Sequence, residues 1–105
     1  MRVISGIFRG KSIAFIKSRI TRPLKDSVKE NIFNIINHSS LLEVKLDNAN
    51  ILDLYSGTGS FGIECISRGA KKVIFVEKDS HAIEILNKNL ITLSIKEKAS
   101  VVNDK

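Results

Sequence analysis

The sequence predicts an α/β fold, namely the first half of a doubly wound parallel sheet preceded by a small β-hairpin. From Asn50 onward, short apolar runs alternate with helical patterns, an order typical of parallel strands joined by right-handed crossovers. Before that point the chain is basic and punctuated by glycine, which is typical of a hairpin and a linker. We therefore divide the chain into a basic hairpin and linker over residues 1–22 and an α/β ligand-binding domain over residues 23–105.

The amino-terminal quarter begins with two short extended runs, RVIS and KSIAFI, within residues 2–16. They lie on either side of GIFRG, and the flanking glycines favour a hairpin. Pro23 can open a helix but cannot lie inside one. Apolar residues then recur at helical spacing in DSVKENIFNIINH, so we expect a helix over residues 26–38.

The second half of the sequence alternates strand and helix patterns. These patterns predict strands over 51–55, 72–77 and 99–104, and helices over 60–68 and 80–93. Gly69 suits the position after the first of these helices, because glycine tolerates a left-handed conformation. In a doubly wound sheet ordered 3-2-1-4-5 the first strand is central. A chain that ends after the third strand leaves ILDLY with an open apolar edge, so we expect the chain to be incomplete.

The composition is that of a globular protein of one domain or less. The chain has 105 residues, of which 43% are hydrophobic, and this argues against a largely disordered protein. No apolar run approaches the roughly 18 residues of a membrane span, and no secretory signal is recognised. The single Cys65 excludes an internal disulfide, and no set of Cys and His has zinc-like spacing. We expect a cytoplasmic protein without a metal ion.

The net charge of +6 is concentrated at the amino terminus. Residues 1–25 carry seven of the 17 basic side chains and no acidic one, whereas the rest of the chain carries ten basic and all 11 acidic groups. Scattered Lys and Arg often only solvate a surface. Their segregation into one segment favours contact with a polyanion instead, because each neutralised phosphate releases condensed counterions.

The stretch DLYSGTGSFG contains a formal G-x-G-x-x-G match at Gly57, Gly59 and Gly62, between a predicted strand and a predicted helix. Such glycines serve either a tight turn or the close approach of a ligand. A dinucleotide loop presents bare N–H groups to a pyrophosphate, and a carboxylate beside it would repel the phosphates. Asp53 lies four residues before Gly57, which favours a ligand with positive groups, such as S-adenosylmethionine. Asp53 could instead cap or orient the loop through the N–H groups of the loop.

Two further acids stand at the ends of the next predicted strands. Glu77 lies 18 residues beyond Gly59, about where an acid reaches the ribose hydroxyls of an adenosine in either cofactor class. Asp104 follows SVVN and would lie beside the adenine, although both acids could instead be solvated carboxylates. The predicted cofactor-binding set is Asp53, Tyr55, Gly57, Gly59, Glu77, Lys78 and Asp104.

Three blocks of the sequence together resemble one family of S-adenosylmethionine-dependent methyltransferases. They are MRVISGIFRGKSI, TRPLKDSVKENIFNII and ILDLYSGTGSFGIECISRGAKKVIFVEKD. Their order and spacing are similar to those of the bacterial family that methylates the exocyclic N2 of a guanine in small-subunit (16S) ribosomal RNA, the RNA methyltransferase D type. The resemblance covers nearly the whole chain and implies a Rossmann-like class I methyltransferase fold.

The resemblance also implies roles for the cofactor residues. Asp53, Gly57 and Gly59 would frame the methionine part of S-adenosylmethionine. Glu77 would take the ribose, and Asp104 would meet the adenine amino group.

The same resemblance assigns the basic amino terminus to ribosomal RNA of the small ribosomal subunit. Phe8 would stack on a base. Arg22 and Asp26 would line the mouth of the pocket, or else fix the helix start. The predicted RNA-contacting set is Arg2, Phe8, Arg9, Lys11, Arg19 and Arg22. We expect the full-length protein to be a monomer.

The catalytic signature of that family is missing from these residues. It is an Asn/Asp-Pro-Pro-Tyr/Phe tetrapeptide that holds the target amine and stacks on the flipped base. The sequence contains one proline, Pro23, so no catalytic residue is assigned and we expect the 105 residues alone to be inactive. Two alternatives stay open: a methyltransferase for another RNA or DNA base, such as adenine N6, and a non-catalytic RNA-binding remnant. A structural protein without a cofactor would leave Asp53, the glycines and Glu77 unexplained.

Overall fold

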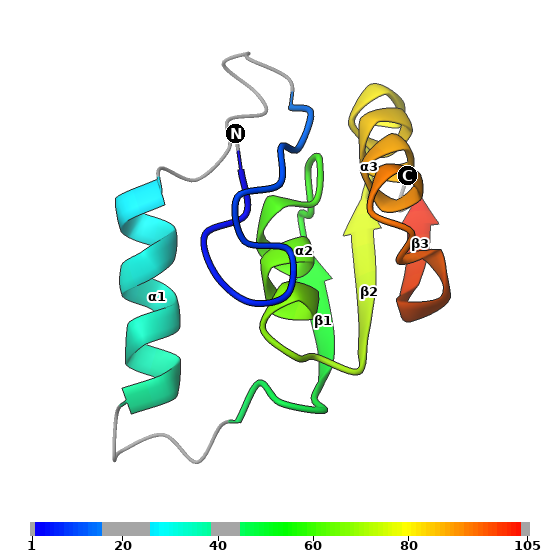
Figure 1. Ribbon diagram of the computed structural model, residues 1–105. Helices are drawn as coiled ribbons and strands as arrows, with labels where there is room; N and C mark the ends of the chain where they lie inside the picture. The colour runs from blue at the N-terminus through cyan, green and yellow to red at the C-terminus, as the bar shows by residue number, and fades with distance from the viewer. Residues whose placement is uncertain (1, 16–25, 39–44, 104–105) are drawn as a thin grey trace.

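The computed structural model describes residues 2–15, 26–38 and 45–103, and its elements follow the order expected from the sequence (Figure 1). The elements are helix α1 (Asp26–His38), strand β1 (Asn50–Leu54), helix α2 (Ser60–Ser67), strand β2 (Lys72–Glu77), helix α3 (Ser80–Thr92), the 3-10 turn η1 (Lys96–Lys98) and strand β3 (Ala99–Asn103). From residue 26 onward the predicted helices and strands are confirmed to within one residue at each described end. The turn η1 alone has no counterpart among the predicted elements.

The three strands form one parallel sheet in the order β1-β2-β3, which confirms the predicted α/β architecture. Asp53 of β1 pairs with Phe75 of β2, and Phe75 pairs in turn with Val101 of β3. Strand β1 is therefore a border strand of this sheet. The carboxyl ends of all three strands meet at one edge, which is where ligands bind in open α/β sheets.

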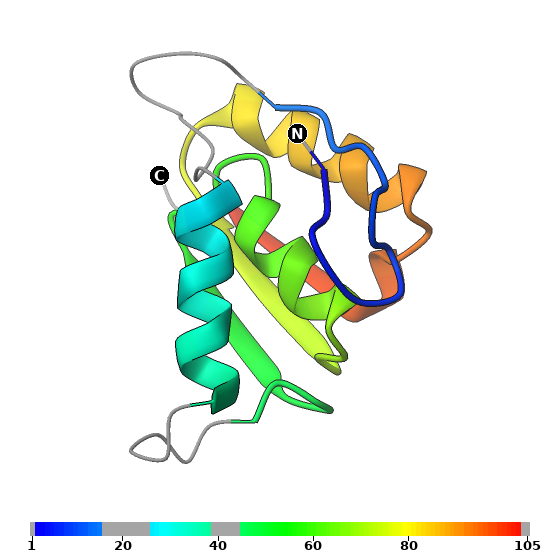
Figure 2. The same cartoon turned by 60° about the vertical axis from the view of Figure 1, so that its left-hand side comes forward.

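The helices lie on one face of the sheet, and the amino-terminal segment crosses the outer side of α2 (Figures 1 and 2). Helix α2 packs closely on β2, because Gly62 has no side chain where a Cβ would run into the ring of Phe75. Isoleucine and leucine side chains of α2 and α3 complete the core there, including Ile63 and Leu86. Gly59, in the loop after β1, lies close to the side chains of both Ile63 and Leu86, so this loop packs against the same core.

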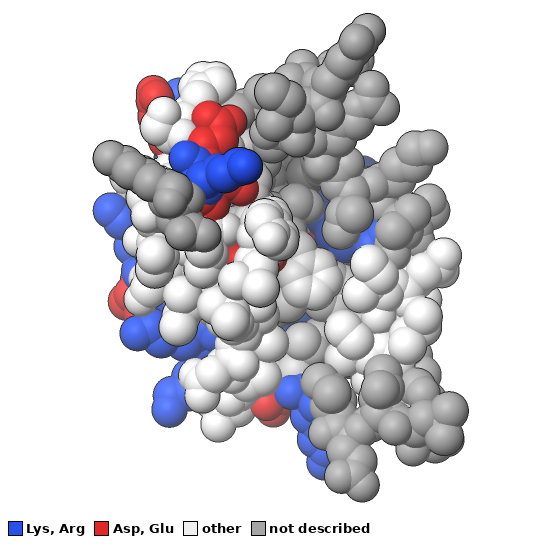
Figure 3. Space-filling model, turned by 180° about the vertical axis from the view of Figure 1, so that it is seen from behind, with Lys and Arg blue, Asp and Glu red and all other residues white. Residues whose placement is uncertain are grey.

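The opposite face of the sheet is apolar and exposed. It carries Leu52, which is 61% exposed, together with Leu54, Ile74 and Val102. Figure 3 shows this face with uncharged atoms across its centre and most of the described Lys and Arg side chains toward its margin.

Helix α2 ends at the glycine that the sequence predicts. Gly69 has a φ of 110°, in the left-handed region. Its N–H donates to the carbonyl of Ile66 at 3.0 Å, and the N–H of Ala70 donates to the carbonyl of Cys65 at 2.9 Å. These two bonds form a Schellman motif, which satisfies the last carbonyls of the helix.

The predicted amino-terminal hairpin is reduced to a single antiparallel bridge between Arg2 and Ser12, and the described part of this segment contains no strand. The reason lies in the hydrogen bonds. The N–H groups of Ile4 and Ser5 donate to the carboxylate of Glu64 at 2.9 and 3.0 Å instead of pairing across a ladder. The segment is therefore a closed loop fastened to α2, and we call residues 2–15 the basic loop.

Candidate cofactor and nucleic-acid site

The glycine stretch forms a sharp turn between β1 and α2 that relies on left-handed backbone. Gly57 has a φ of 57° and Gly59 a φ of 94°, and Gly59 is the N-cap of α2. Tyr55 also has a positive φ, of 58°, although its side chain is bulky and 88% exposed. A non-glycine residue held in this region stores strain, and such strain clusters at ligand sites.

Asp53 lies under this turn and orients it. Asp53 is only 8% exposed, and its Oδ2 accepts the N–H of Gly62 at 3.2 Å. It therefore supplies the capping contact that the N-cap Gly59 lacks. Burial raises the pKa of Asp53 to about 6, the Gly62 hydrogen bond opposes this rise, and the nearby Glu77 adds to it. Of the two roles considered for Asp53, the loop-orienting contact is present, and direct contact with a ligand stays a prediction.

Glu77 joins the glycine turn to the end of β2. Its Oε1 accepts the N–H of Gly57 at 2.8 Å. Its Oε2 accepts the N–H groups of Lys78 and Asp79 at 3.1 and 2.9 Å. One side chain thus fixes the geometry of both loops at the carboxyl edge of the sheet. The structure brings Asp53, Tyr55, Gly57, Gly59, Glu77 and Lys78 together there, whereas Asp104 lies outside the described residues.

The charge at this edge indicates what kind of ligand fits. Among the described residues neither Asp53 nor Glu77 forms an ion pair, and their mutual repulsion contributes to the raised pKa of Asp53. A pyrophosphate placed here would face two carboxylates. A ligand with a cationic group and sugar hydroxyls would instead be stabilised by them. The residues present therefore fit S-adenosylmethionine better than a dinucleotide.

A buried cluster of charged side chains, which was not predicted from the sequence, lies on the outer side of α2. Glu64 and Lys29 are both fully buried, with 3.3 Å between Glu64 Oε1 and Lys29 Nζ. Arg68 Nε lies 2.9 Å from Glu64 Oε2. Burial alone would raise the pKa of Glu64, but the N–H groups of Ile4 and Ser5 and the two cations lower it. The only sequence signal is a charged residue on an otherwise apolar helical face.

Asn89 of α3 is a second buried polar residue that the sequence did not mark as important, and it is only 3% exposed. Its Oδ1 accepts the N–H of Ala14 at 2.8 Å, and its Nδ2 donates to the carbonyl of Ala14 at 2.9 Å. The same Nδ2 donates to the carbonyl of Thr58, in the glycine turn, at 3.0 Å. The basic loop is therefore hydrogen-bonded through one side chain to the glycine turn, which carries several of the residues predicted to bind the cofactor. The signal in the sequence is an amide beside Leu90 on the apolar face of its helix.

The residues predicted to contact RNA separate into two groups. Arg2, Arg9 and Lys11 are exposed on the basic loop, whereas Arg19 and Arg22 lie outside the described residues. Phe8 is partly buried and packs against the core. The exposed apolar side chain of that turn is its neighbour Ile7, at 72%. The ring that was predicted to stack on a base therefore already packs against the core, and stacking by Phe8 stays a prediction.

Within residues 2–15, 26–38 and 45–103, none of the helices has the length and apolar composition needed to cross a bilayer. The same residues contain no group of three or more His, Cys, Asp or Glu side chains placed to hold a metal ion.

Comparison with known proteins decides the family. The family described as "Conserved hypothetical protein 95" matches residues 1–105, the whole chain. The chain belongs to this family. The Haemophilus influenzae protein named "Ribosomal RNA small subunit methyltransferase D" is 39% identical over 104 residues, covering 98% of this chain and 51% of that protein. A Bacillus subtilis protein named "Putative rRNA methyltransferase YlbH" is 43% identical over 101 residues, covering 96% of this chain and 52% of that protein.

Solved structures agree with this membership of the Conserved hypothetical protein 95 family. The Escherichia coli protein described as "Putative methyltransferase yhhF" superposes with a TM-score of 0.82 at 32% identity, over 100% of this chain and 52% of that one. The resemblance to methyltransferases of the D type and the Rossmann-like fold are both confirmed. The chain spans about half the length of the curated relatives it matches.

Proposed function

We propose that the protein is an S-adenosylmethionine-dependent methyltransferase that acts on the exocyclic N2 of a guanine in small-subunit ribosomal RNA. The observation that carries the cofactor assignment is the convergence of Asp53 and Glu77 on one strained glycine turn. The ribosomal RNA assignment is supported by the names of the relatives. The choice of guanine N2 rests on the resemblance of the three sequence blocks to the family with that specificity.

S-adenosylmethionine, when bound, supplies a methyl group carried on a positively charged sulfur. The carboxylate of Asp53 would balance positive charge at the methionine end of the cofactor. Glu77 already accepts three N–H groups, one on Oε1 and two on Oε2, and the remaining lone pair on Oε1 would accept a ribose hydroxyl. Gly57 and Gly59 leave the backbone open to close approach, and Tyr55 would cover the exposed side of the turn. Asp104 would lie beside the adenine.

The basic loop would hold the RNA through Arg2, Arg9 and Lys11. Transfer to a guanine amine needs alignment of that amine with the methyl group and loss of one proton. The Pro-Pro tetrapeptide that aligns the amine in this family does not occur in these 105 residues, whose single proline is Pro23. We propose that this chain contributes cofactor and RNA binding, and that no residue in it is catalytic.

Calorimetric titration with S-adenosylhomocysteine tests the cofactor assignment. We expect wild-type chain to bind, and Glu77→Ala to bind at least about tenfold more weakly, because bonds to a charged acceptor are lost. Glu84→Ala removes an exposed carboxylate from α3 and serves as the matched control, with affinity unchanged. A folded wild-type chain that fails to bind, or a Glu77→Ala variant that binds equally well, refutes the assignment.

The substrate is tested in cells that carry or lack the gene. Small-subunit ribosomal RNA from the two strains is digested to nucleosides, and mass spectrometry then shows which methylated nucleoside is lost. Loss of N2-methylguanosine supports the proposal, and loss of N6-methyladenosine supports the adenine alternative. If no methylated nucleoside is lost while the chain binds RNA, the non-catalytic RNA-binding alternative is correct.

A further inference from the structure

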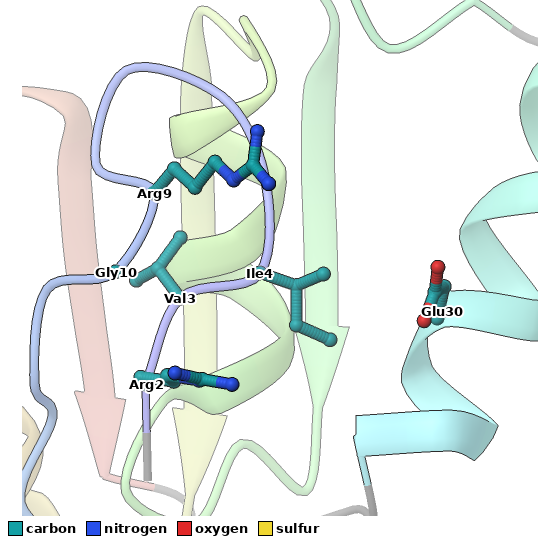
Figure 4. A pocket seen from close by; sticks show the side chains of 6 residues that line it. All are labelled: Arg2, Val3, Ile4, Arg9, Gly10 and Glu30. Carbon is teal, nitrogen blue, oxygen red and sulfur yellow. The ribbon is translucent and has the colours of Figure 1, made fainter.

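A pocket of about 310 Å³ opens between the basic loop and α1 (Figure 4). Its lining residues are Arg2, Val3, Ile4, Arg9, Gly10 and Glu30. Figure 4 shows the side chains of Arg2, Ile4 and Arg9 projecting toward α1, which carries Glu30 on the far side. This volume lies at the lower end of the range for small-molecule sites, so it suits one nucleotide and not a longer stretch of RNA.

The two walls of this pocket are fastened to the same buried atom. Glu64 Oε1 accepts the N–H of Ile4 at 2.9 Å, which fixes the wall formed by the basic loop. The same oxygen lies 3.3 Å from Nζ of Lys29, the residue before Glu30, which fixes the wall formed by α1. Breaking a buried ion pair of this kind is costly, so the spacing of the walls is maintained before any ligand arrives.

The charges in the pocket match the parts of a nucleotide. Among the described residues Arg2 and Arg9 form no ion pair, and guanidinium groups bind phosphate through paired N–H donors. Glu30 is exposed and has acceptor oxygens only, which suit the amino or imino edge of a base. Ile4 adds an apolar contact between these polar groups.

The pocket is separate from the cofactor edge. Glu64 is four residues past Ser60, about one helical turn along α2 from the glycine turn. It lies in the helical layer and not at the carboxyl ends of the strands, where Asp53 and Glu77 meet. This separation favours a nucleotide next to the one that receives the methyl group as the ligand of the pocket.

We propose that this pocket binds a flanking nucleotide of the substrate RNA, with its phosphate on Arg2 and Arg9 and its base edge on Glu30. The inference rests on the proposed function, since it takes the partner to be RNA. It adds a second, specific contact point to an interface that would otherwise consist of dispersed positive charge.

Filter binding of a small-subunit ribosomal RNA transcript, at several salt concentrations, tests the pocket. We expect Arg2→Ala/Arg9→Ala to weaken RNA binding at least about tenfold and to leave S-adenosylhomocysteine binding unchanged. The control Lys88→Ala/Lys96→Ala removes two exposed positive charges from α3 and η1 and should weaken binding less than about threefold. Equal losses in the two double variants would show only diffuse electrostatics and overturn the proposal.

Phosphate-ethylation interference on the same transcript locates the contact. Ethylation of one phosphate outside the methylated nucleotide should weaken binding of the wild-type chain and have no effect on the double alanine variant. Arg2→Lys/Arg9→Lys keeps the charges and should retain the fold, but ethylation of that phosphate should weaken its RNA binding less than it weakens wild-type binding. This variant tests the pocket if the alanine variant does not fold. If RNA and S-adenosylhomocysteine both bind but no phosphate signal is lost in the variants, the pocket inference fails and the proposed function stands. If neither binds to the folded wild-type chain, both fail.

Discussion

Replacing Asp53 by asparagine should stabilise the fold at neutral pH and weaken cofactor binding at the same time. Asparagine has nearly the same shape, and its Oδ1 can still accept the N–H of Gly62. What it removes is the charge. Burial is the main cause that raises the pKa of Asp53 from 3.8 to about 6, so the folded chain holds this charge at a cost in free energy.

The sign and size of the stability effect follow from proton linkage. Because the folded pKa lies above the unfolded value of 3.8, the folded state binds more protons between these two values. This stabilising contribution is complete below pH 3.8 and is lost as the pH rises through about 6. A difference of about two pKa units corresponds to about 3 kcal/mol. We therefore expect Asp53→Asn to raise the free energy of unfolding by up to about 3 kcal/mol at pH 7.5, and by little near pH 4.

Protonation of Asp53 should weaken cofactor binding, although it stabilises the fold. If the ionised carboxylate binds the cationic end of S-adenosylmethionine, the affinity rises as the pH increases through about 6. One pH unit below that value about ten in 11 molecules carry the proton, so the affinity at pH 5 should be about tenfold weaker than at pH 7.5. In Asp53→Asn this dependence should disappear, and the affinity should stay at or below the low-pH value of the wild type.

The assay is calorimetric titration of S-adenosylmethionine at pH 5 to 7.5, together with urea unfolding at each pH. The exposed Glu84 of α3 offers the control Glu84→Gln, which makes the same charge change without burial. A flat affinity profile in the wild type, or a profile that persists in Asp53→Asn, would refute direct interaction of the cofactor with this charge. Destabilisation of Asp53→Asn at pH 7.5 would refute the linkage argument.

Two other substitutions test how the site is supported. Asn89→Ala leaves the Thr58 carbonyl and the Ala14 backbone unpaired. It should lower the free energy of unfolding in urea by about 1–3 kcal/mol and weaken S-adenosylhomocysteine binding. A variant with unchanged stability and affinity would show that water replaces the amide. Gly62→Ala would push a methyl group into the Phe75 ring and should lower the free energy of unfolding by about 1–3 kcal/mol, with a loss below about 0.5 kcal/mol contradicting the packing argument.

The elements of this fold were predictable because each follows from a local pattern. The run of β-branched and aromatic residues in KVIFVE and the helical spacing around Leu86 and Leu90 depend only on residues that are close together in the chain. Parallel order then follows from the strand–helix alternation, since crossovers of this length are right-handed. The pairing of Asp53 with the glycine turn and the position of Glu77 at the next strand end are consequences of that order.

The hairpin prediction shows where such reasoning stops. Two extended runs around GIFRG are a local hairpin signal, but N–H groups of that loop find better acceptors elsewhere. Ile7 donates its N–H to the carbonyl of Ser67 at 2.8 Å, and Phe8 donates to the hydroxyl of the same residue at 3.0 Å. An ionised carboxylate is a stronger acceptor than a carbonyl across a short ladder, so Glu64 overrides the local preference.

Glu64 and Asn89 support the candidate site, although neither residue was predicted to bind a ligand. Each is a buried polar residue on a helical face that is otherwise apolar, and each has partners in the basic loop, 60 and 75 residues away in the chain. A polar group left unpaired in such a position would be strongly destabilising, so its presence in the sequence implies a partner without naming it. The partners in the basic loop are backbone atoms, which have no side-chain signature in the sequence. The segment proposed to hold RNA is thereby bonded to the helix that begins at Ser60 and to the turn at Thr58, so the same two buried side chains would set the proposed RNA and cofactor sites relative to each other.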